Sequence, residues 1–364
     1  MGERGRDPLR SGRNGLKADG MAVPLKVRLA LTSGLPAVMR QVRRRWPLIV
    51  AYHGVCRDAE WRDWDTSDLV AESCFRQHLA LYRRHYNVVS LKHMVDVLTG
   101  RRNDLPPRAL AITFDDGYRN NFTVALPALR DFGFSATFFC CTGFLDGRID
   151  LWWLPFKRAI LAAQQAGRPA ELPGLGSVDV SSRESSFAAY GRILTRVRAM
   201  RADQRAEVIR QLDQRGAEDL LRDVYAPMTW EEVRQAAAQG VEIGAHTVTH
   251  AAVHLESPER ARAEVRGSAD RVRQETGQAE IPFAYPNGQP EDTTPEVVEV
   301  IRQSGCYAGL ANFAGRNSGP DQLYQLRRSS IGGHHTAGAL ELDLCGLRAA
   351  ATRVRGLVSF GHRA

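Results

Sequence analysis

Long apolar runs are missing from this 364-residue sequence. Between residues 26 and 46, Arg28, Ser33 and Pro36 interrupt every stretch that approaches the length needed to cross a bilayer. The apolar run at residues 29–31 is too short for the core of a cleavable signal peptide, and no clean small-residue cleavage site follows it. The sequence therefore predicts neither a transmembrane helix nor a signal peptide, and it favours a cytoplasmic or peripheral inner-membrane location.

Metal-type cysteine pairs and nucleic-acid motifs are also missing. The six cysteines include no C-x-x-C spacing, so we expect reduced and mostly buried thiols. The net charge of +8 is compatible with an anionic partner. No basic motif is interleaved with aromatic residues, however, and the few lysines indicate a compositional bias toward arginine. No nucleic-acid partner is predicted.

What the sequence does contain is organised around A-L-A-I-T-F-D-D-G-Y at residues 109–118. A near-continuous apolar run is typical of a strand buried on both faces, and this one ends in two carboxylates. Because side chains alternate along a strand, Asp115 and Asp116 should point in different directions and serve different roles. The alternative is that D-D-G only begins a helix.

Strands and helices alternate on both sides of this stretch, which predicts a parallel α/β fold. The strand at residues 47–54 ends in Tyr52-His53, where the histidine is either a hydrogen-bonded core residue or a functional group. The other expected strands cover residues 86–89, 135–140 and 241–246, and the expected helices cover residues 73–85, 91–98, 121–132 and 229–239.

Three segments fall outside this alternation. Residues 1–24 are predicted to be disordered, with Met21 as a second candidate start, and residues 25–46 to form a basic amphipathic helix that either rests on a membrane surface or covers the core. A helical insertion is expected at about 145–228, with one long helical region at 184–215. Its Trp152 and Trp153 either stack on a sugar or anchor the insertion. Residues 332–364 are expected to form a helical extension.

A second polar motif, H-T-V-T-H, follows the predicted strand at 241–246. Thr229 and Glu232 have capping-box spacing, which starts the helix before that strand. His246 and His250, four residues apart, can bind one metal if the backbone turns helically. Two imidazoles with one carboxylate leave coordination positions open, as in a catalytic metal site.

T-F-D-D-G at 113–117 and H-T-V-T-H at 246–250 resemble the motifs of polysaccharide deacetylases of the NodB-homology type, carbohydrate esterase family 4. The resemblance covers about residues 47–331. It implies an irregular (β/α)7 barrel with a helical insertion, Asp115 as the general base, and a divalent metal, most often Zn²⁺, held by Asp116, His246 and His250.

The third family motif appears here as A-Y-P-N-G at residues 284–288, with Ala284 where the family often has an arginine. Arg328 is therefore a candidate to orient Asp115. The resemblance also implies substrate or oxyanion contacts for Tyr285, Pro286 and Asn287. A subgroup that acts on poly-N-acetylglucosamine has a similar early Y-H pair, which implies that His53 is the general acid. His334 and His335 lack a clear late motif, and His254 is expected near the site or at the surface.

Together these features predict a hydrolase that removes N-acetyl groups from an amino-sugar polysaccharide or a lipid-linked glycan precursor in surface-polysaccharide assembly. Two alternatives remain: hydrolysis of another C–N bond on the same barrel, and a catalytically degenerate barrel that only binds glycans. The intact Asp115, Asp116, His246 and His250 argue against the second alternative.

Overall fold

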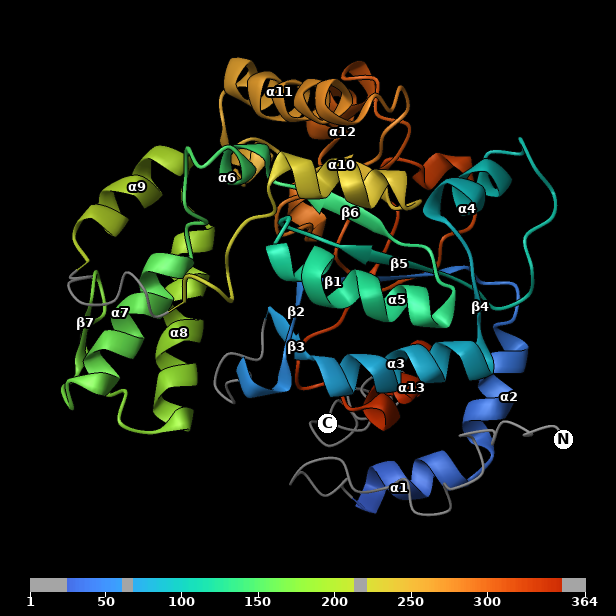
Figure 1. Ribbon diagram of the computed structural model, residues 1–364, viewed down its shortest axis with the longest axis horizontal. Helices are drawn as coiled ribbons and strands as arrows, with labels where there is room; N and C mark the ends of the chain where they lie inside the picture. Colours follow the sequence, from blue (N-terminus) through green and yellow to red (C-terminus); the bar gives the residue numbers. More distant parts are fainter. Residues whose placement is uncertain (1–24, 61–67, 213–220, 349–364) are drawn as a thin grey trace, which may run out of the picture.

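The computed structural model describes residues 25–60, 68–212 and 221–348. The predicted disorder at residues 1–24 and the last part of the predicted C-terminal extension, residues 349–364, lie outside these ranges. Within them the chain alternates strands and helices, with the helices packed around a central sheet (Figure 1).

The main sheet has eight strands, all paired in parallel. Its hydrogen-bonded order is β11-β10-β9-β6-β5-β1-β12, and β4 pairs with β5 beside this path. Strands β11 and β12 stand at the two ends of this order. Leu326, just before β12, also pairs with Leu310 of β11, so the segment that leads into one edge strand lies beside the other edge strand. The sheet curls into a half-barrel, which confirms the predicted fold class. Its strands are β1 (Leu48–Tyr52), β4 (Asn87–Val88), β5 (Ala109–Phe114), β6 (Thr137–Cys140), β9 (Glu242–Ala245), β10 (Phe283–Ala284), β11 (Gly309–Leu310) and β12 (Ser329–Ser330).

Strand β5 shows how the sheet separates apolar packing from the polar site. Leu110, Ile112 and Phe114 belong to the larger core cluster, which also contains apolar residues of α3 (Glu72–His85) and α5 (Leu126–Phe132). Ala109 and Ala111 belong to a second cluster with residues of α4 (Leu91–Leu98). Because side chains alternate, Thr113 and Asp115 continue the row of Ala111. The carboxyl end of β5 therefore carries polar groups above an apolar layer.

Helix boundaries follow the predicted signals in α10 (Trp230–Ala238) but not at the start of α5. Thr229 Oγ1 accepts a hydrogen bond of 3.2 Å from the Glu232 N–H, and Glu232 Oε2 accepts one of 2.9 Å from the Thr229 N–H. This confirms the capping box. The helix predicted at 121–132 instead begins with a π-helical segment, Asn121–Ala125, before α5. Gly133 ends it with a φ of 69°, as a left-handed C-cap does.

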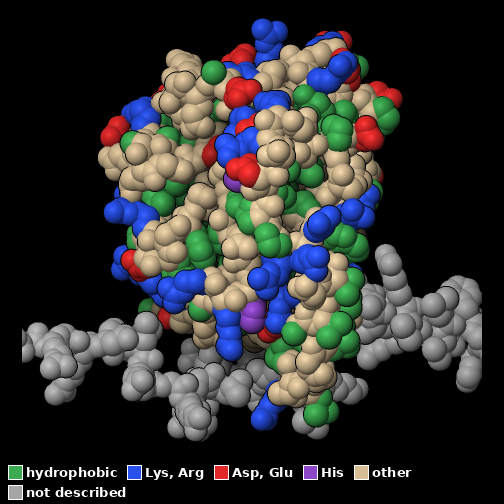
Figure 2. Space-filling view, turned by 90° about the vertical axis from the view of Figure 1, so that its right-hand side faces the viewer, with side chains coloured by type: hydrophobic (Ala, Val, Ile, Leu, Met, Phe, Trp, Pro, Cys, Tyr) green, Lys and Arg blue, Asp and Glu red, His purple; other side chains and the backbone are tan. Residues whose placement is uncertain are grey.

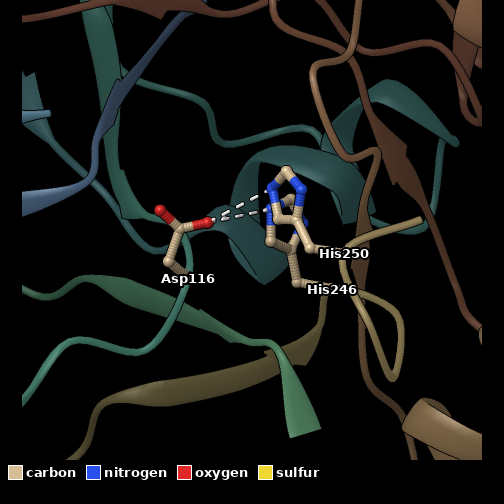
Figure 3. A group of neighbouring side chains, drawn as sticks. All are labelled: Asp116, His246 and His250. Carbon is tan, nitrogen blue, oxygen red and sulfur yellow. Dashed lines mark ion pairs between the residues drawn. The ribbon is translucent and has the colours of Figure 1, made fainter. Parts of the chain in front are cut away.

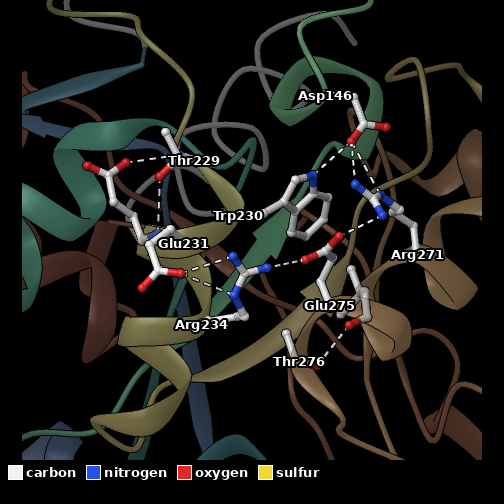
Figure 4. Close-up of polar contacts among 10 residues, drawn as sticks. Asp146, Thr229, Trp230, Glu231, Arg234, Arg271, Glu275 and Thr276 are labelled. Carbon is white, nitrogen blue, oxygen red and sulfur yellow. Dashed lines mark hydrogen bonds and ion pairs between the residues drawn. The ribbon is translucent and has the colours of Figure 1, made fainter.

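A network of ion pairs joins the helices that follow β6 and β9 (Figure 4). Asp146, at the end of α6 (Thr142–Leu145), accepts hydrogen bonds of 2.7 Å from Trp230 Nε1 and 3.0 Å from Arg271 Nη2. Arg271 and Arg234 both pair with Glu275 of α11 (Pro258–Thr276). These contacts hold α6, α10 and α11 together beside β9, the strand that the H-T-V-T-H motif follows.

The insertion packs at one side of the barrel (Figure 1). The helical region predicted at 184–215 consists of two helices in its described part, because the chain breaks after Arg198 and the Gln204 side chain accepts a hydrogen bond from the Arg201 N–H where the second helix starts. The Gly-rich passage before the first of these helices forms a β-hairpin, in which Gly174 and Gly176 have positive φ. The insertion comprises α7 (Leu154–Gln165), β7 (Ala170–Leu172), β8 (Gly176–Val178), α8 (Arg183–Arg198) and α9 (Ala202–Arg210).

The single amphipathic helix predicted at 25–46 is also wrong. It is split into α1 (Leu25–Thr32) and α2 (Leu35–Val42) at Gly34, which has a φ of 75°. In α1, Val27 and Leu31 pack against Gly338 of α13 (Ala337–Leu344). Helix α1 therefore covers one end of the molecule, which agrees with the alternative in which this segment covers the core.

The remaining elements are small. Strands β2 (Gly54–Cys56) and β3 (Leu69–Ala71) pair in parallel, and α12 (Pro295–Gln303) packs on α11. Short helical turns are η1 (Asp58–Glu60), η3 (Val253–Leu255), η4 (Pro290–Asp292) and η5 (Pro320–Gln322). Five of the six cysteines are buried, as expected. In the described ranges we find no helix with both the length and the hydropathy of a membrane span.

Candidate active site

Three predicted metal ligands converge at the carboxyl ends of β5 and β9 (Figure 3). Asp116 Oδ1 lies 3.4 Å from His246 Nε2 and 3.4 Å from His250 Nε2, and all three side chains are buried. One ligand atom from each residue lies within 4.8 Å of the other two. The two motifs, more than a hundred residues apart in sequence, therefore form one group.

The donor set fits a divalent metal. Both Asp116 oxygens are buried without a hydrogen-bond partner among the described residues, so a cation would satisfy an otherwise unpaired carboxylate. His246 Nδ1 lies 2.8 Å from the Ala284 carbonyl, an arrangement in which Nδ1 donates and Nε2 keeps its lone pair for a metal. Burial lowers the pKa of His250 to about 4, so this ring is neutral and able to bind. The described structure thus provides a candidate divalent metal site.

The backbone at this group is strained. Five described non-glycine residues have positive φ, and four of them belong to the candidate site: Asp116, Thr247, His250 and Asn287. Such conformations cost on the order of 1–3 kcal/mol each and persist only where the surroundings enforce them. The two histidines converge without a helical turn between them, because Thr247 and His250 adopt left-handed conformations outside any helix.

Glu264 of α11 holds this strained turn and was missed in the sequence. Its Oε2 accepts hydrogen bonds of 2.9 and 2.8 Å from the Val248 and Thr249 N–H groups, and its Oε1 accepts one of 2.6 Å from Thr249 Oγ1. The carboxylate is buried. An acid on the otherwise apolar stripe with Ala261 and Val265 is the sequence signal that could have indicated it.

The side chain of Asp115 pairs with that of Arg328. Arg328 Nη1 and Nη2 donate hydrogen bonds of 2.7 Å to the two carboxylate oxygens, and both side chains are buried. Arg328 also donates to Thr113 Oγ1 and to the Ala311 carbonyl. Burial raises the pKa of Asp115, but the charge and the hydrogen bonds of Arg328 lower it by more, so that its pKa lies below the ordinary value. The carboxylate is held ionised in one orientation.

His53 follows β1 and faces the same end of the sheet. Its Nδ1 is buried without a hydrogen-bond partner in the described structure. The carbonyl of Tyr52, the residue before it, accepts a hydrogen bond of 2.9 Å from the Asp115 N–H, so His53 lies beside the end of β5. The structure thus brings the early histidine to the group formed by the two later motifs.

The A-Y-P-N-G segment contributes backbone groups more than side chains. Tyr285 is buried, and its hydroxyl donates to the Tyr324 carbonyl at 2.6 Å. The Tyr285 and Gly288 N–H groups bond to Leu310 and Pro286 carbonyls, and Pro286 has no N–H. The amide of Asn287, in a left-handed conformation, is therefore the candidate donor in this turn.

Trp152 and Trp153 are only 7% and 6% exposed, so neither offers an open face for sugar stacking. Trp152 Nε1 lies 3.3 Å from His250 Nδ1, while Trp153 packs edge-on against the His250 ring and donates to the Tyr118 hydroxyl. The anchoring alternative agrees with this geometry: both rings join the insertion to the wall of the site.

The remaining predicted histidines lie elsewhere. His254 Nδ1 lies 3.0 Å from Asp292 Oδ1, a contact that links η3 to η4. The His335 carbonyl lies 2.6 Å from His78 Nε2, behind the site. His78 is fully buried, its Nδ1 lies 3.1 Å from the Tyr52 hydroxyl, and burial lowers its pKa to about 4. This histidine, also missed in the sequence, ties α3 to β1 and to the segment before α13.

Comparisons with known proteins agree with this geometry. The family model described as polysaccharide deacetylase matches residues 102–169 and 199–308, which include both motifs. No curated protein matches the chain.

Solved structures show a similar fold. The deacetylase PplD of Streptococcus pyogenes, in complex with acetate, is 17% identical with a TM-score of 0.53, covering 81% of this chain and 96% of its own. A de-N-acetylase of Aggregatibacter actinomycetemcomitans is 17% identical with a TM-score of 0.52, covering 81% and 98%. IcaB of Ammonifex degensii is 15% identical with a TM-score of 0.51, covering 82% and 97%.

The structural likenesses, at these identities, concern the fold alone. The family model adds a sequence match through both polar motifs, and the half-barrel brings those motifs together around one buried Asp-His-His group. These matches support the polysaccharide deacetylase family as the family of this chain.

Proposed function

We propose that this protein is a metal-dependent hydrolase that removes N-acetyl groups from an amino-sugar glycan, either a polysaccharide or a lipid-linked precursor. One observation carries the proposal: Asp115, ionised and oriented by Arg328, stands beside the buried group of Asp116, His246 and His250. Zinc is the proposed metal.

The candidate metal site and the Asp115–Arg328 pair have different proposed roles. When bound by Asp116, His246 and His250, a divalent metal supplies a Lewis acid that acidifies water and polarises the acetyl carbonyl. Asp115 accepts a proton from the attacking water. Because Arg328 donates a hydrogen bond to each carboxylate oxygen, Asp115 keeps one orientation, and its remaining lone pairs are available to the water.

His53 and Asn287 complete the proposed chemistry. Amide hydrolysis consumes one water and releases acetate and the free amine of the sugar. The proposed role of His53 is to donate a proton to the departing nitrogen. The Asn287 amide is the proposed donor to the oxyanion that develops on the acetyl oxygen. Tyr285 and Pro286 are proposed to shape the wall on that side.

The alternative of a glycan-binding barrel without activity is disfavoured by the geometry. Binding a glycan needs neither a carboxylate held ionised by a buried arginine nor a second buried carboxylate that has two imidazoles beside it and no hydrogen-bond partner among the described residues. Hydrolysis of another C–N bond is tested below. We further propose that the enzyme acts in surface-polysaccharide assembly, in the cytoplasm or at the inner membrane.

The test is acetate release from N-acetylglucosamine oligomers by metal-stripped protein, before and after addition of Zn²⁺. Metal binding is measured separately by calorimetric titration, with Asp116→Asn as the variant that should lose it. We expect metal-dependent release that falls at least about a hundredfold in Asp115→Asn and in His53→Ala, while both bind Zn²⁺ nearly as the unaltered protein does.

The outcomes separate the alternatives. Zinc binding at a ratio near one without acetate release from any N-acetylated glycan would assign the site to another C–N bond. Absence of metal binding would overturn the catalytic proposal. Full activity in His53→Ala would remove that residue from the role of general acid and leave the rest of the mechanism standing.

A further inference from the structure

Helix α2 presents an apolar stripe to solvent. Leu35, Val38 and Val42, at positions i, i+3 and i+7, lie on one helical face and are 46%, 57% and 68% exposed. Leu29 of the neighbouring α1 is 60% exposed. Four of the five large hydrophobic residues that are exposed in the described structure therefore belong to this helix pair, and the fifth, Phe187, lies on α8.

The opposite side of the helix pair is firmly attached to the domain. Pro36 is buried, and Arg40 pairs with Glu341 of α13. Val27 and Leu31 of α1 pack at Gly338. The break at Gly34 lets α1 bury its apolar residues on α13 while those of α2 turn outward. The exposed stripe is thus held in place by the fold.

Arginines surround the end of this stripe. Arg43 and Arg316 each lie over the Trp46 ring, with their guanidinium carbons 4.9 and 5.2 Å from its centroid. Arg44, Arg45 and Arg316 line a cavity of about 590 Å³ together with apolar residues that include Leu105 and Pro106. On the face that Figure 2 shows, Lys and Arg side chains lie beside hydrophobic ones in its lower half.

We propose that this α2 surface, made of Leu35, Val38, Val42 and the arginines 43, 44, 45 and 316, docks on an anionic phospholipid bilayer. The apolar stripe enters the boundary between headgroups and acyl chains, and the arginines contact lipid phosphates. Charge favours this occupant over the chain's own ends, because residues 1–24 carry five basic and three acidic residues, and residues 349–364 carry three arginines and no acid.

Docking in this way leaves the candidate active site open. Strand β1 begins at Leu48, directly after the arginines, and its other end leads into His53. At roughly 3.3 Å per residue the strand separates the two ends of the sheet. The bilayer would contact the amino-terminal ends of the strands, while the site at their carboxyl ends faces the aqueous phase. The proposal does not depend on which bond the enzyme hydrolyses.

The test is co-sedimentation of the full chain with vesicles of phosphatidylcholine, with and without about one third phosphatidylglycerol. Two double variants address the two halves of the surface, Val38→Asp with Val42→Asp and Arg44→Glu with Arg45→Glu. Val38→Ser with Val42→Ser removes apolar area without adding charge. Phe187→Asp and Arg192→Glu on α8 are matched controls, since both residues are exposed on another face. Thermal unfolding checks that every variant is folded.

We expect the unaltered protein and both controls to bind only the anionic vesicles, with binding weakened by added salt. Each double variant should lose affinity by about tenfold or more. Absence of binding to anionic vesicles would overturn the proposal, as would unchanged binding by the folded double variants. Size-exclusion chromatography tests whether a second copy of the chain covers the stripe instead. A dimer that becomes a monomer in the Val38→Ser, Val42→Ser variant, together with no vesicle binding, would assign the stripe to a second copy of the chain.

Discussion

The two oxygens of Asp115 each accept a hydrogen bond of 2.7 Å from Arg328, which lies 213 positions later in the chain. Ala284 occupies the position at which the family motif often has an arginine, and here an arginine reaches the carboxylate from the position just before β12. Because β12 is hydrogen-bonded to β1, and β1 to β5, the curled sheet brings Arg328 beside the end of β5. A buried, bidentate pair of this kind fixes both the charge and the orientation of the carboxylate.

Arg328→Lys should lower kcat/KM by about a hundredfold while zinc affinity stays nearly unchanged. A lysine ammonium keeps the positive charge but cannot make two parallel hydrogen bonds, so Asp115 loses its fixed orientation. Arg328→Met removes the charge as well. Burial then raises the pKa of Asp115, and the acidic limb of the kcat/KM profile should move to higher pH, because the base must be ionised.

Arg327→Met is the matched control, since Arg327 precedes Arg328 and its guanidinium packs over Phe313. It should leave both kcat/KM and the pH profile nearly unchanged. Activity of Arg328→Lys equal to that of the unaltered protein would contradict the assignment of Arg328 as the residue that positions Asp115.

Glu264→Ala should weaken zinc binding by about 10 to 100-fold, measured by calorimetric titration. The carboxylate accepts three hydrogen bonds from the turn between His246 and His250, so its loss releases two backbone N–H groups and the strained conformation that aims His250. Glu264→Gln keeps one oxygen for the two N–H groups and should lose less affinity.

Glu259→Ala on the same helix provides the comparison, because the Glu259 side chain is 79% exposed and forms only a surface ion pair. Zinc affinity in that variant should match the unaltered protein. Equal affinities for Glu264→Ala and Glu259→Ala would show that the turn holds its conformation without the buried carboxylate.

His78 should make the protein less stable at mildly acid pH. Burial lowers the pKa of His78 to about 4, whereas an exposed histidine in the unfolded chain titrates near 6.5. Between these values the unfolded chain binds a proton that the folded protein does not, so the free energy of unfolding falls as the pH falls. This one group accounts for about 2 kcal/mol between about pH 7.5 and pH 5.

The measurement is urea unfolding at both pH values for the unaltered protein and His78→Gln, which cannot titrate. The loss on acidification should be about 2 kcal/mol smaller in the variant. His93→Gln, a change at a partly exposed histidine of α4, serves as control and should leave the loss nearly unchanged. The same acid sensitivity in all three proteins would contradict the assignment to His78.

The sequence by itself determined the fold class, most element positions and the two motifs that form the metal group. These features depend on neighbours along the chain: the apolar run of β5, the capping box at Thr229 and the carboxylates that follow a buried strand. Patterns of this kind carry over into the structure because hydrogen bonding and side-chain alternation are local.

Only the tertiary structure decided how those motifs are supported. It brought Arg328, which the sequence offered only as a candidate, to Asp115, and it brought Glu264 to the turn before His250 and His78 to Tyr52. It buried the two tryptophans that could otherwise have faced a sugar. It also split the amino-terminal helix at Gly34. The partners of buried polar groups come from elements that are distant in sequence and meet only when the sheet curls. Their identity therefore follows from packing and cannot be inferred from spacing.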